Sequence, residues 1–177
     1  MTKFEILLHP DQKLKKVCNP IPIVTDEIKE LASKMLNTMY DASGIGLAAP
    51  QIGILKRIFV MDCSDNESQS EPLVLINPEI VWVSAKKKIH EEGCLSIPEF
   101  FGEVERPAEV RIKSMDQNGS ENEYHFNGLE AICAQHEMDH LNGVLFIDYL
   151  GPIRRKIITS KMKKLKREKA RNVQLPK

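Results

Sequence analysis

The stretch QHEMDH, residues 135–140, contains the pattern His-Glu-x-x-His. Residues four apart lie side by side on a helix, so His136 and His140 can bind one metal ion while Glu137 reaches the water bound to it. A motif this short also arises by chance on a solvated helix. The residues around it are therefore needed to decide between a metal site and an ordinary helix.

Those residues indicate a buried helix. An apolar stripe at helical spacing contains both histidines, the glutamate and three further residues, Leu129, Ile132 and Cys133. Polar groups buried without partners cost on the order of 1 to 3 kcal/mol each, and a metal ion would satisfy three of them together. Asn127 is a suitable N-cap, and Asn142-Gly143 offers the left-handed residue at which a helix ends.

A catalytic metal centre of the zinc type usually takes three protein ligands and leaves one position for water. Downstream of His140 the chain contains no His or Cys, so the third ligand is expected upstream. Cys133 lies seven residues before His140, roughly 10 Å along the helix axis, and is interpreted as a core residue. Cys94 is the better candidate, because Gly93 allows a tight backbone path that brings a thiolate close to an ion.

A third segment, GIGLAAPQ at residues 44–51, is a glycine-rich loop that ends in the amide of Gln51. It lacks the third glycine of a dinucleotide site and the Lys-Ser/Thr pair of a phosphate loop. Its backbone N–H and C=O groups could instead hold an extended peptide and polarise its carbonyl.

These segments resemble those of the bacterial peptide deformylases, which carry three motifs of the forms GxGLAAxQ, EGCLS and QHExDH. Here they read GIGLAAPQ (44–51), EGCLS (92–96) and QHEMDH (135–140), in the family's order and with similar spacing. The resemblance covers about residues 1–150. It implies a hydrolase in which a metal-activated water removes the N-formyl group from the formyl-methionine of newly made polypeptides and releases formate.

The resemblance also implies one divalent metal ion held by Cys94, His136 and His140. Iron(II) is the expected native ion, although the donor set alone suits zinc, nickel or cobalt as well. Glu137 would take a proton from the water and return it to the departing amine. The donors to the developing oxyanion would be the Gln51 side chain and the backbone N–H of Leu95.

Substrate-binding residues follow from the same family layout. Gly46 would pair with the peptide backbone as an added strand does. Candidates for the methionine pocket are Ile45, Leu129, Ile132 and Cys133, each equally explained as ordinary core. Glu92 and Arg106 are expected to form a pair that orients the cysteine loop.

Two other functions remain open at this point. An endopeptidase of the zincin type uses the same helix motif but needs a third ligand downstream. A non-catalytic relative would bind formylated peptides without turnover, and the presence of Glu137 and Gln51 argues against it.

The predicted fold is α+β, with antiparallel sheets packed around the metal-binding helix and a basic helix at the C-terminus. A helix is predicted over residues 26–41, and strands over residues 57–61, 73–77, 79–84, 109–115 and 122–126. Residues 1–177 are expected to form a single domain, with a catalytic core over residues 1–150 and a basic tail over residues 151–177.

The net charge of zero hides an uneven distribution. Residues Arg154 to Arg171 contain ten Lys or Arg and one acid, while the rest of the chain has 15 basic and 24 acidic groups. A partial apolar stripe favours a packed terminal helix with a solvated basic face; its members are Ile153, Ile157, Ile158, Met162 and Leu165. The alternative is contact with ribosomal RNA through that face.

The sequence predicts neither a membrane-spanning segment nor a signal peptide. Glu5 interrupts the only short apolar run near the N-terminus, and the longest uncharged stretch, residues 42–55, is too short and too rich in glycine to span a bilayer. The four cysteines are widely scattered. The protein is expected to be cytoplasmic with reduced thiols.

Overall fold

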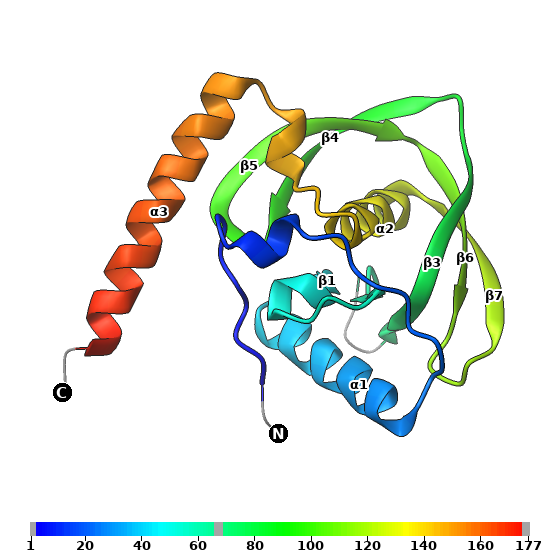
Figure 1. The fold of residues 1–177 in the computed structure, drawn as a ribbon. Helices are drawn as coiled ribbons and strands as arrows, with labels where there is room; N and C mark the ends of the chain where they lie inside the picture. Colours follow the sequence, from blue (N-terminus) through cyan, green and yellow to red (C-terminus); the bar gives the residue numbers. More distant parts are fainter. Residues whose placement is uncertain (1–2, 66–68, 175–177) are drawn as a thin grey trace.

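The computed structural model describes residues 3–65 and 69–174. One helix, α2 (Gly128–Leu141), lies in the middle, and the strands and other helices surround it (Figure 1). A five-stranded antiparallel sheet has the order β1-β2-β3-β6-β7, with β1 (Gly46–Ala48), β2 (Ile58–Met61), β3 (Leu73–Val83), β6 (Glu109–Met115) and β7 (Glu121–Asn127). A second sheet is the hairpin of β4 (Lys87–Cys94) and β5 (Ile97–Pro107). The predicted arrangement of antiparallel sheets around a central helix is confirmed.

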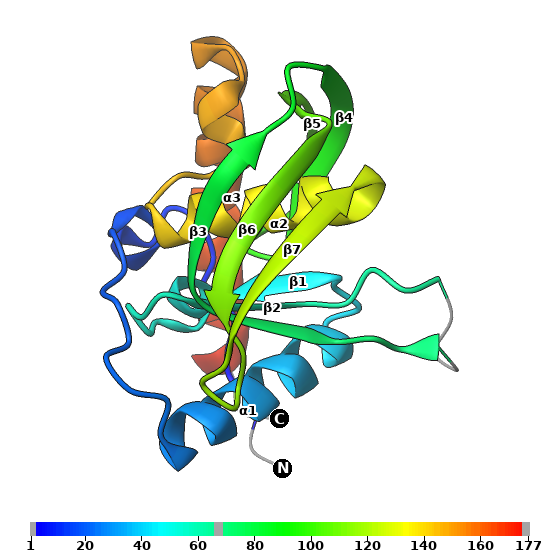
Figure 2. The ribbon, with the colours of Figure 1, turned by 90° about the vertical axis from the view of Figure 1, so that its right-hand side faces the viewer.

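The buried residues of α2 extend around more of the helix than the single apolar stripe that was predicted. From Ala131 to Leu141 all but two residues are buried, because the five-stranded sheet lies on one side of α2 and the β4–β5 hairpin on another (Figure 2). Leu129 was predicted to lie on the buried stripe, and this was wrong, because its side chain is 42% exposed in the first turn of the helix. Asn127 occupies the N-cap position, but its side chain makes no capping hydrogen bond.

The helix α1 (Asp26–Asp41) has the predicted bounds. Its apolar face, which includes Ile28, Met35 and Met39, packs against the sheet in a second core cluster with Leu47, Val60 and Ile76. This packing fixes β1, which lies inside the glycine-rich segment 44–51. The strand contacts both α1 and α2 and is held between them.

The strand prediction was wrong in the middle of the sheet. The two strands predicted over residues 73–77 and 79–84 are one strand, β3, which passes through an irregularity between Ile76 and Glu79. Asn77 there has a φ of 48°, and its side-chain amide exchanges two hydrogen bonds with the backbone of Ile21. The Asn77 backbone N–H donates to the Arg57 carbonyl at 2.8 Å, and the strand continues through the bulge where Asn77-Pro78 suggested a break.

Three strands were missed. The strand β1 has only three residues and lies in a glycine-rich segment, which hides its pairing with β2. The strand β4 is largely exposed and rich in charge, so it gives no apolar alternation. In β5 buried residues alternate with exposed ones from Gly102 to Arg106, but Val104 is the only large apolar residue among those five, so the sequence shows no apolar alternation there either.

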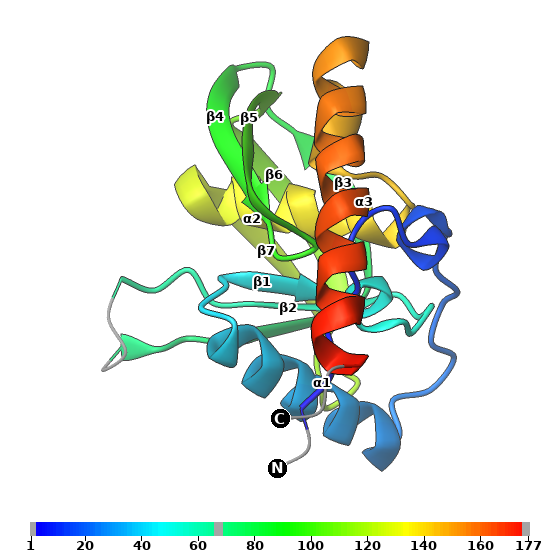
Figure 3. The same ribbon diagram turned by 90° about the vertical axis from the view of Figure 1, so that its left-hand side faces the viewer.

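The C-terminal helix α3 (Pro152–Gln174) runs along one side of the molecule (Figure 3). Ile158 and Met162 are buried in a third core cluster with residues of β5, η1 (Gln12–Lys15) and η4 (Phe146–Tyr149). The predicted stripe was too wide, because Ile153 and Ile157 are 76% and 49% exposed. Among the described residues no helix combines the length and the apolar character needed to cross a bilayer.

We predict that Met162→Ala lowers the free energy of unfolding by about 2 to 4 kcal/mol, because the side chain is fully buried and its removal leaves a cavity. Ile153→Ala on the same helix is the matched control, with an expected change within about 0.5 kcal/mol. The measurement is urea unfolding of both variants in one metal state. Equal effects of the two substitutions would show that α3 is not packed as described.

Candidate active site

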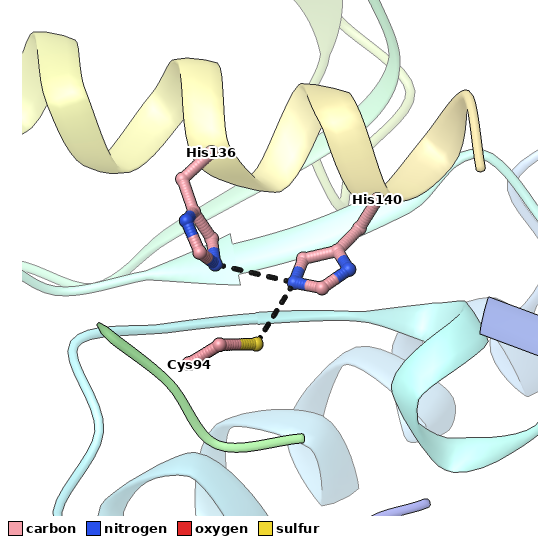
Figure 4. Close-up of side chains that lie close together, drawn as sticks. All are labelled: Cys94, His136 and His140. Carbon is pink, nitrogen blue, oxygen red and sulfur yellow. Dashed lines mark hydrogen bonds between the residues drawn. The ribbon is translucent and has the colours of Figure 1, made fainter. Parts of the chain in front are cut away.

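Three donor atoms from two separate elements meet at one point. Cys94 is the last residue of β4, and His136 and His140 lie one turn apart on α2 (Figure 4). Cys94 Sγ is 3.3 Å from His140 Nε2, which is 3.2 Å from His136 Nε2. The three ligand atoms all lie within 4.8 Å of one another.

This donor set fits a divalent transition metal. Tetrahedral coordination by thiolate and imidazole at ordinary bond lengths places the ligand atoms roughly 3.3 to 3.6 Å apart, close to the two separations observed here. A thiolate with two imidazoles is also a ligand combination that such metals favour. Cys133, by contrast, lies outside the group and directs its Sγ toward the Ile45 carbonyl, 3.6 Å away.

A buried network of hydrogen bonds connects the β4–β5 hairpin to α2. The Glu92 carboxylate, 4% exposed, accepts two hydrogen bonds from Arg106, of 2.6 and 2.9 Å, and its Oε1 lies 2.9 Å from His136 Nδ1. Arg106 also donates to Asp139 of α2, which accepts a hydrogen bond from the Tyr149 hydroxyl. The expected pairing of Glu92 with Arg106 is present, and it reaches a metal-ligand candidate directly.

These contacts set the protonation of the site in the protein without a metal. Burial alone would raise the pKa of Glu92, but the hydrogen bonds from Arg106 and His136 hold it below its usual value. Burial would lower the pKa of His136, yet the contacts with Cys94 and Glu92 raise it well above normal. Burial and the charge of His136 lower the pKa of His140 well below normal. Metal binding should therefore release a proton.

Glu137 is buried beside the three donors. Its side chain is 3% exposed, and among the described residues its Oε2 has no hydrogen-bond partner. Burial raises its pKa to about 7. Such a carboxyl group can gain and lose a proton near neutral pH, as a general acid–base group must.

Gln51 is fixed with its amide donor toward the site. It belongs to the short helix η2 (Ala49–Ile52), and its Oε1 accepts a hydrogen bond of 2.9 Å from the Ala48 backbone N–H. Its Nε2 is thereby directed to Ser96 Oγ at 3.2 Å and Cys94 Sγ at 3.6 Å. Ser96, which is fully buried, was not predicted to position this amide, because no local pattern indicates its contact with Gln51.

The glycine at position 46 is required by close packing. A Cβ atom there would lie 2.5 Å from Glu137 Oε1 and 2.9 Å from Cys133 Sγ. Any larger residue would push apart β1 and the site face of α2. The strand can approach this closely only because Gly46 has no side chain.

A cavity of about 470 Å³ opens beside these residues. All four candidates for the methionine pocket, Ile45, Leu129, Ile132 and Cys133, line it, as do Gly46, Gln51, Leu95 and Glu137. The hairpin adds a wall that the sequence reading missed, formed by Ile97, Pro98, Phe100 and Phe101. In the sequence, the two adjacent phenylalanines that follow the EGCLS motif could have indicated this wall.

Comparisons with known proteins agree with this geometry. The family model of polypeptide deformylase matches residues 3–156. The peptide deformylase of Polynucleobacter necessarius is 49% identical over 168 residues, which are 95% of this chain and 97% of the relative. The chain belongs to the polypeptide deformylase family.

Solved structures of the family share the fold described above. The peptide deformylase of Legionella pneumophila is 40% identical with a TM-score of 0.89, covering 99% of this chain and all of that one. The enzyme of Ehrlichia chaffeensis in complex with actinonin is 37% identical with a TM-score of 0.90, covering 94% and 99% of the two chains. As a member of this family, the protein is a metal-dependent hydrolase that removes the N-formyl group from newly made polypeptides.

Proposed function

We propose that Cys94, His136 and His140 hold the catalytic divalent ion and that Glu137 is the general acid–base residue of the deformylation. The observation that carries this proposal is the convergence of three metal-ligand atoms beside a buried carboxylate with an unpaired oxygen. A divalent ion held by these three residues would lower the pKa of a coordinated water toward about 7 and so supply a nucleophile near neutral pH.

The Glu137 side chain is proposed to carry out the proton transfers of the reaction. Glu137, buried beside the three donor atoms, accepts the proton from the nucleophilic water as the new C–O bond forms at the formyl carbon. The same carboxyl group delivers that proton to the departing amine when the C–N bond breaks. Formate and a free methionyl amine are the products.

Two donors are assigned to the negative charge that develops on the formyl oxygen. Gln51 offers a side-chain N–H that is already aimed at the site by the Ala48 and Ser96 contacts. Leu95, which follows the cysteine and lines the cavity, offers its backbone N–H. Loss of one such donor typically costs about 3 kcal/mol of transition-state stabilisation.

Substrate binding is assigned to the cavity. The apolar wall formed by Ile45, Leu129, Ile132 and Cys133 suits a flexible methionine side chain, and the partial exposure of Ile45 and Leu129 leaves apolar surface for a ligand to cover. Gly46, at the end of β1, is the proposed partner of the peptide backbone, which would add as an extended strand.

We predict that Glu137→Gln keeps about one metal ion per chain and lowers kcat for a formyl-Met peptide by roughly a hundredfold to ten-thousandfold, because the shape of the side chain is kept and its proton-accepting oxygen is lost. The measurements are metal content and formate release on the same preparation.

Glu130→Gln is the matched control, since Glu130 lies exposed in the first turn of the same helix. It should change neither quantity. Near-normal turnover in Glu137→Gln would remove Glu137 from the mechanism, and loss of the metal would make it a ligand. Formate release by the wild type excludes a relative that only binds formylated chains.

Iron(II) is our proposal for the native ion, and zinc, nickel and cobalt are ions the same donors could hold. Cys94 is partly exposed, and its thiolate beside a redox-active ion is open to oxidation. Protein purified without oxygen should therefore contain iron and lose activity in air faster than its zinc form. Equal half-lives of the two forms would count against iron.

We also propose that the enzyme works in the cytoplasm and contacts ribosomal RNA through α3. Nine of the ten Lys and Arg residues between Arg154 and Arg171 are exposed. Among the described residues none of the ten forms a salt bridge, although nine ion pairs occur elsewhere. Helical spacing places five of these cations on the face opposite the buried Ile158 and Met162: Lys156, Lys163, Lys164, Arg167 and Arg171. Such a group of exposed cations favours a polyanion as the partner.

If this face neutralises five phosphates, its affinity for ribosomes should fall roughly 100- to 500-fold between 50 and 200 mM salt. A triple variant of exposed cations on α3 should weaken binding and reduce this salt dependence; it contains Lys156→Gln, Lys164→Gln and Arg167→Gln. The matched control makes the same charge change on the sheets, with Lys86→Gln, Lys88→Gln and Lys113→Gln. Equal binding by the two triple variants would contradict the assignment to α3.

A further inference from the structure

Two cysteine thiols meet behind the wall of the active-site cavity. Cys63 follows β2 and is partly exposed, whereas Cys133 on α2 is buried, and both are free thiols. Cys63 packs against the core cluster that contains Cys133. The proximity of the Cys63 side chain also helps to raise the pKa of the Cys133 thiol above its usual value. The catalytic reaction as proposed uses neither sulfur for chemistry.

The backbone between them explains why they meet. The Asp62 N–H donates to the Ile45 carbonyl at 2.9 Å, which extends the β1–β2 pairing toward Cys63. The Cys133 Sγ approaches that same carbonyl from the helix side, at 3.6 Å. Both cysteines thus lie at the same end of the strand pair, around the Ile45 carbonyl, and the Cys133 sulfur lies next to Gly46.

We propose that Cys63 and Cys133 form a modification site at which a peroxide closes a disulfide. The sulfur of Cys63 is the accessible one, so it is the atom that meets the oxidant. Cys133 is the resolving partner, and the proximity of the Cys63 side chain together with burial raises its pKa well above the usual value, which keeps it a thiol until then.

The chemistry balances with hydrogen peroxide as the only co-reactant. The Cys63 thiolate attacks one peroxide oxygen, the O–O bond breaks, and a sulfenic acid forms with release of hydroxide, which takes up the thiol proton as water. The Cys133 sulfur then displaces the sulfenic oxygen, which leaves with the Cys133 proton as a second water. Two thiols lose two electrons in total and the peroxide gains them. A small thiol reductant reverses the step by exchange.

The expected consequence rests on the proposed role of the cavity. Cys133 lines the cavity, and its sulfur lies against the position that a Cβ of residue 46 would occupy. Drawing that sulfur to a disulfide bond length of about 2.05 Å from Cys63 must move it relative to Gly46 and the methionine pocket. The oxidised enzyme should therefore bind formyl-Met peptides more weakly while its metal ligands stay in place.

The test uses full-length zinc-loaded protein treated with hydrogen peroxide and mapped by mass spectrometry without reduction. We expect a peptide linking Cys63 to Cys133. After unfolding with a chelator, which frees Cys94, the count of free thiols should fall from four to two and return to four with dithiothreitol. Cys63→Ser should give no such link, while Cys18→Ser, with another buried cysteine changed, should still give it. Metal content should not change.

Three results of the map would overturn the site: a Cys63 that stays reduced, a Cys63 oxidised without a link, or a link to Cys94. A several-fold rise in KM that dithiothreitol reverses, absent from Cys63→Ser, would support the pocket effect, and an unchanged KM in the linked protein would overturn it. If the untreated protein releases no formate, the proposed function fails, but the peptide map still decides the disulfide.

Discussion

The buried carboxylate of Glu92 is the group on which the site depends. A charge that is 4% exposed is costly unless it is fully paired, and here Arg106 and His136 pair it. These contacts join the β4–β5 hairpin to α2, although the hairpin and the helix are separate in sequence. Because Cys94 lies two residues after Glu92, docking the carboxylate also delivers the thiolate to the two imidazoles. Breaking such a buried pair typically costs 3 to 5 kcal/mol, so the hairpin has little freedom to dock elsewhere.

The rest of the site is arranged by close packing against the same helix. Gly46 lets β1 approach Glu137 and Cys133, and η2 follows directly with Gln51. The surfaces proposed to bind, polarise and hydrolyse the substrate thus come from three segments fixed to one buried helix. The structural role of α2 cannot be separated from its proposed chemical role, because the residues that fill the core around it are next to those proposed to hold the proton and the metal.

The sequence predicted this centre better than it predicted the strands around it. Ligand spacing on a helix is local, so His136, His140 and Glu137 could be placed from their order alone, and α1 was placed by its apolar period. The position of Cys94 depends on a hairpin whose first strand is charged and exposed, and no local pattern indicates that strand. Asn77 and Ser96 illustrate the same limit, since each acts through a partner that is distant in sequence. The exposure of Leu129, Ile153 and Ile157 likewise reflects where neighbouring elements end, which helical periodicity does not contain.

The central claim is that one sulfur and two imidazole nitrogens, supplied by β4 and α2, hold the ion. X-ray absorption at the metal edge, on protein purified without oxygen, measures this directly. The account predicts one sulfur at about 2.3 Å with two imidazole nitrogens at about 2.0 to 2.1 Å, and loss of the sulfur in Cys94→Ser but not in Cys133→Ser. A spectrum without sulfur, or one whose sulfur persists in Cys94→Ser and vanishes in Cys133→Ser, would contradict it.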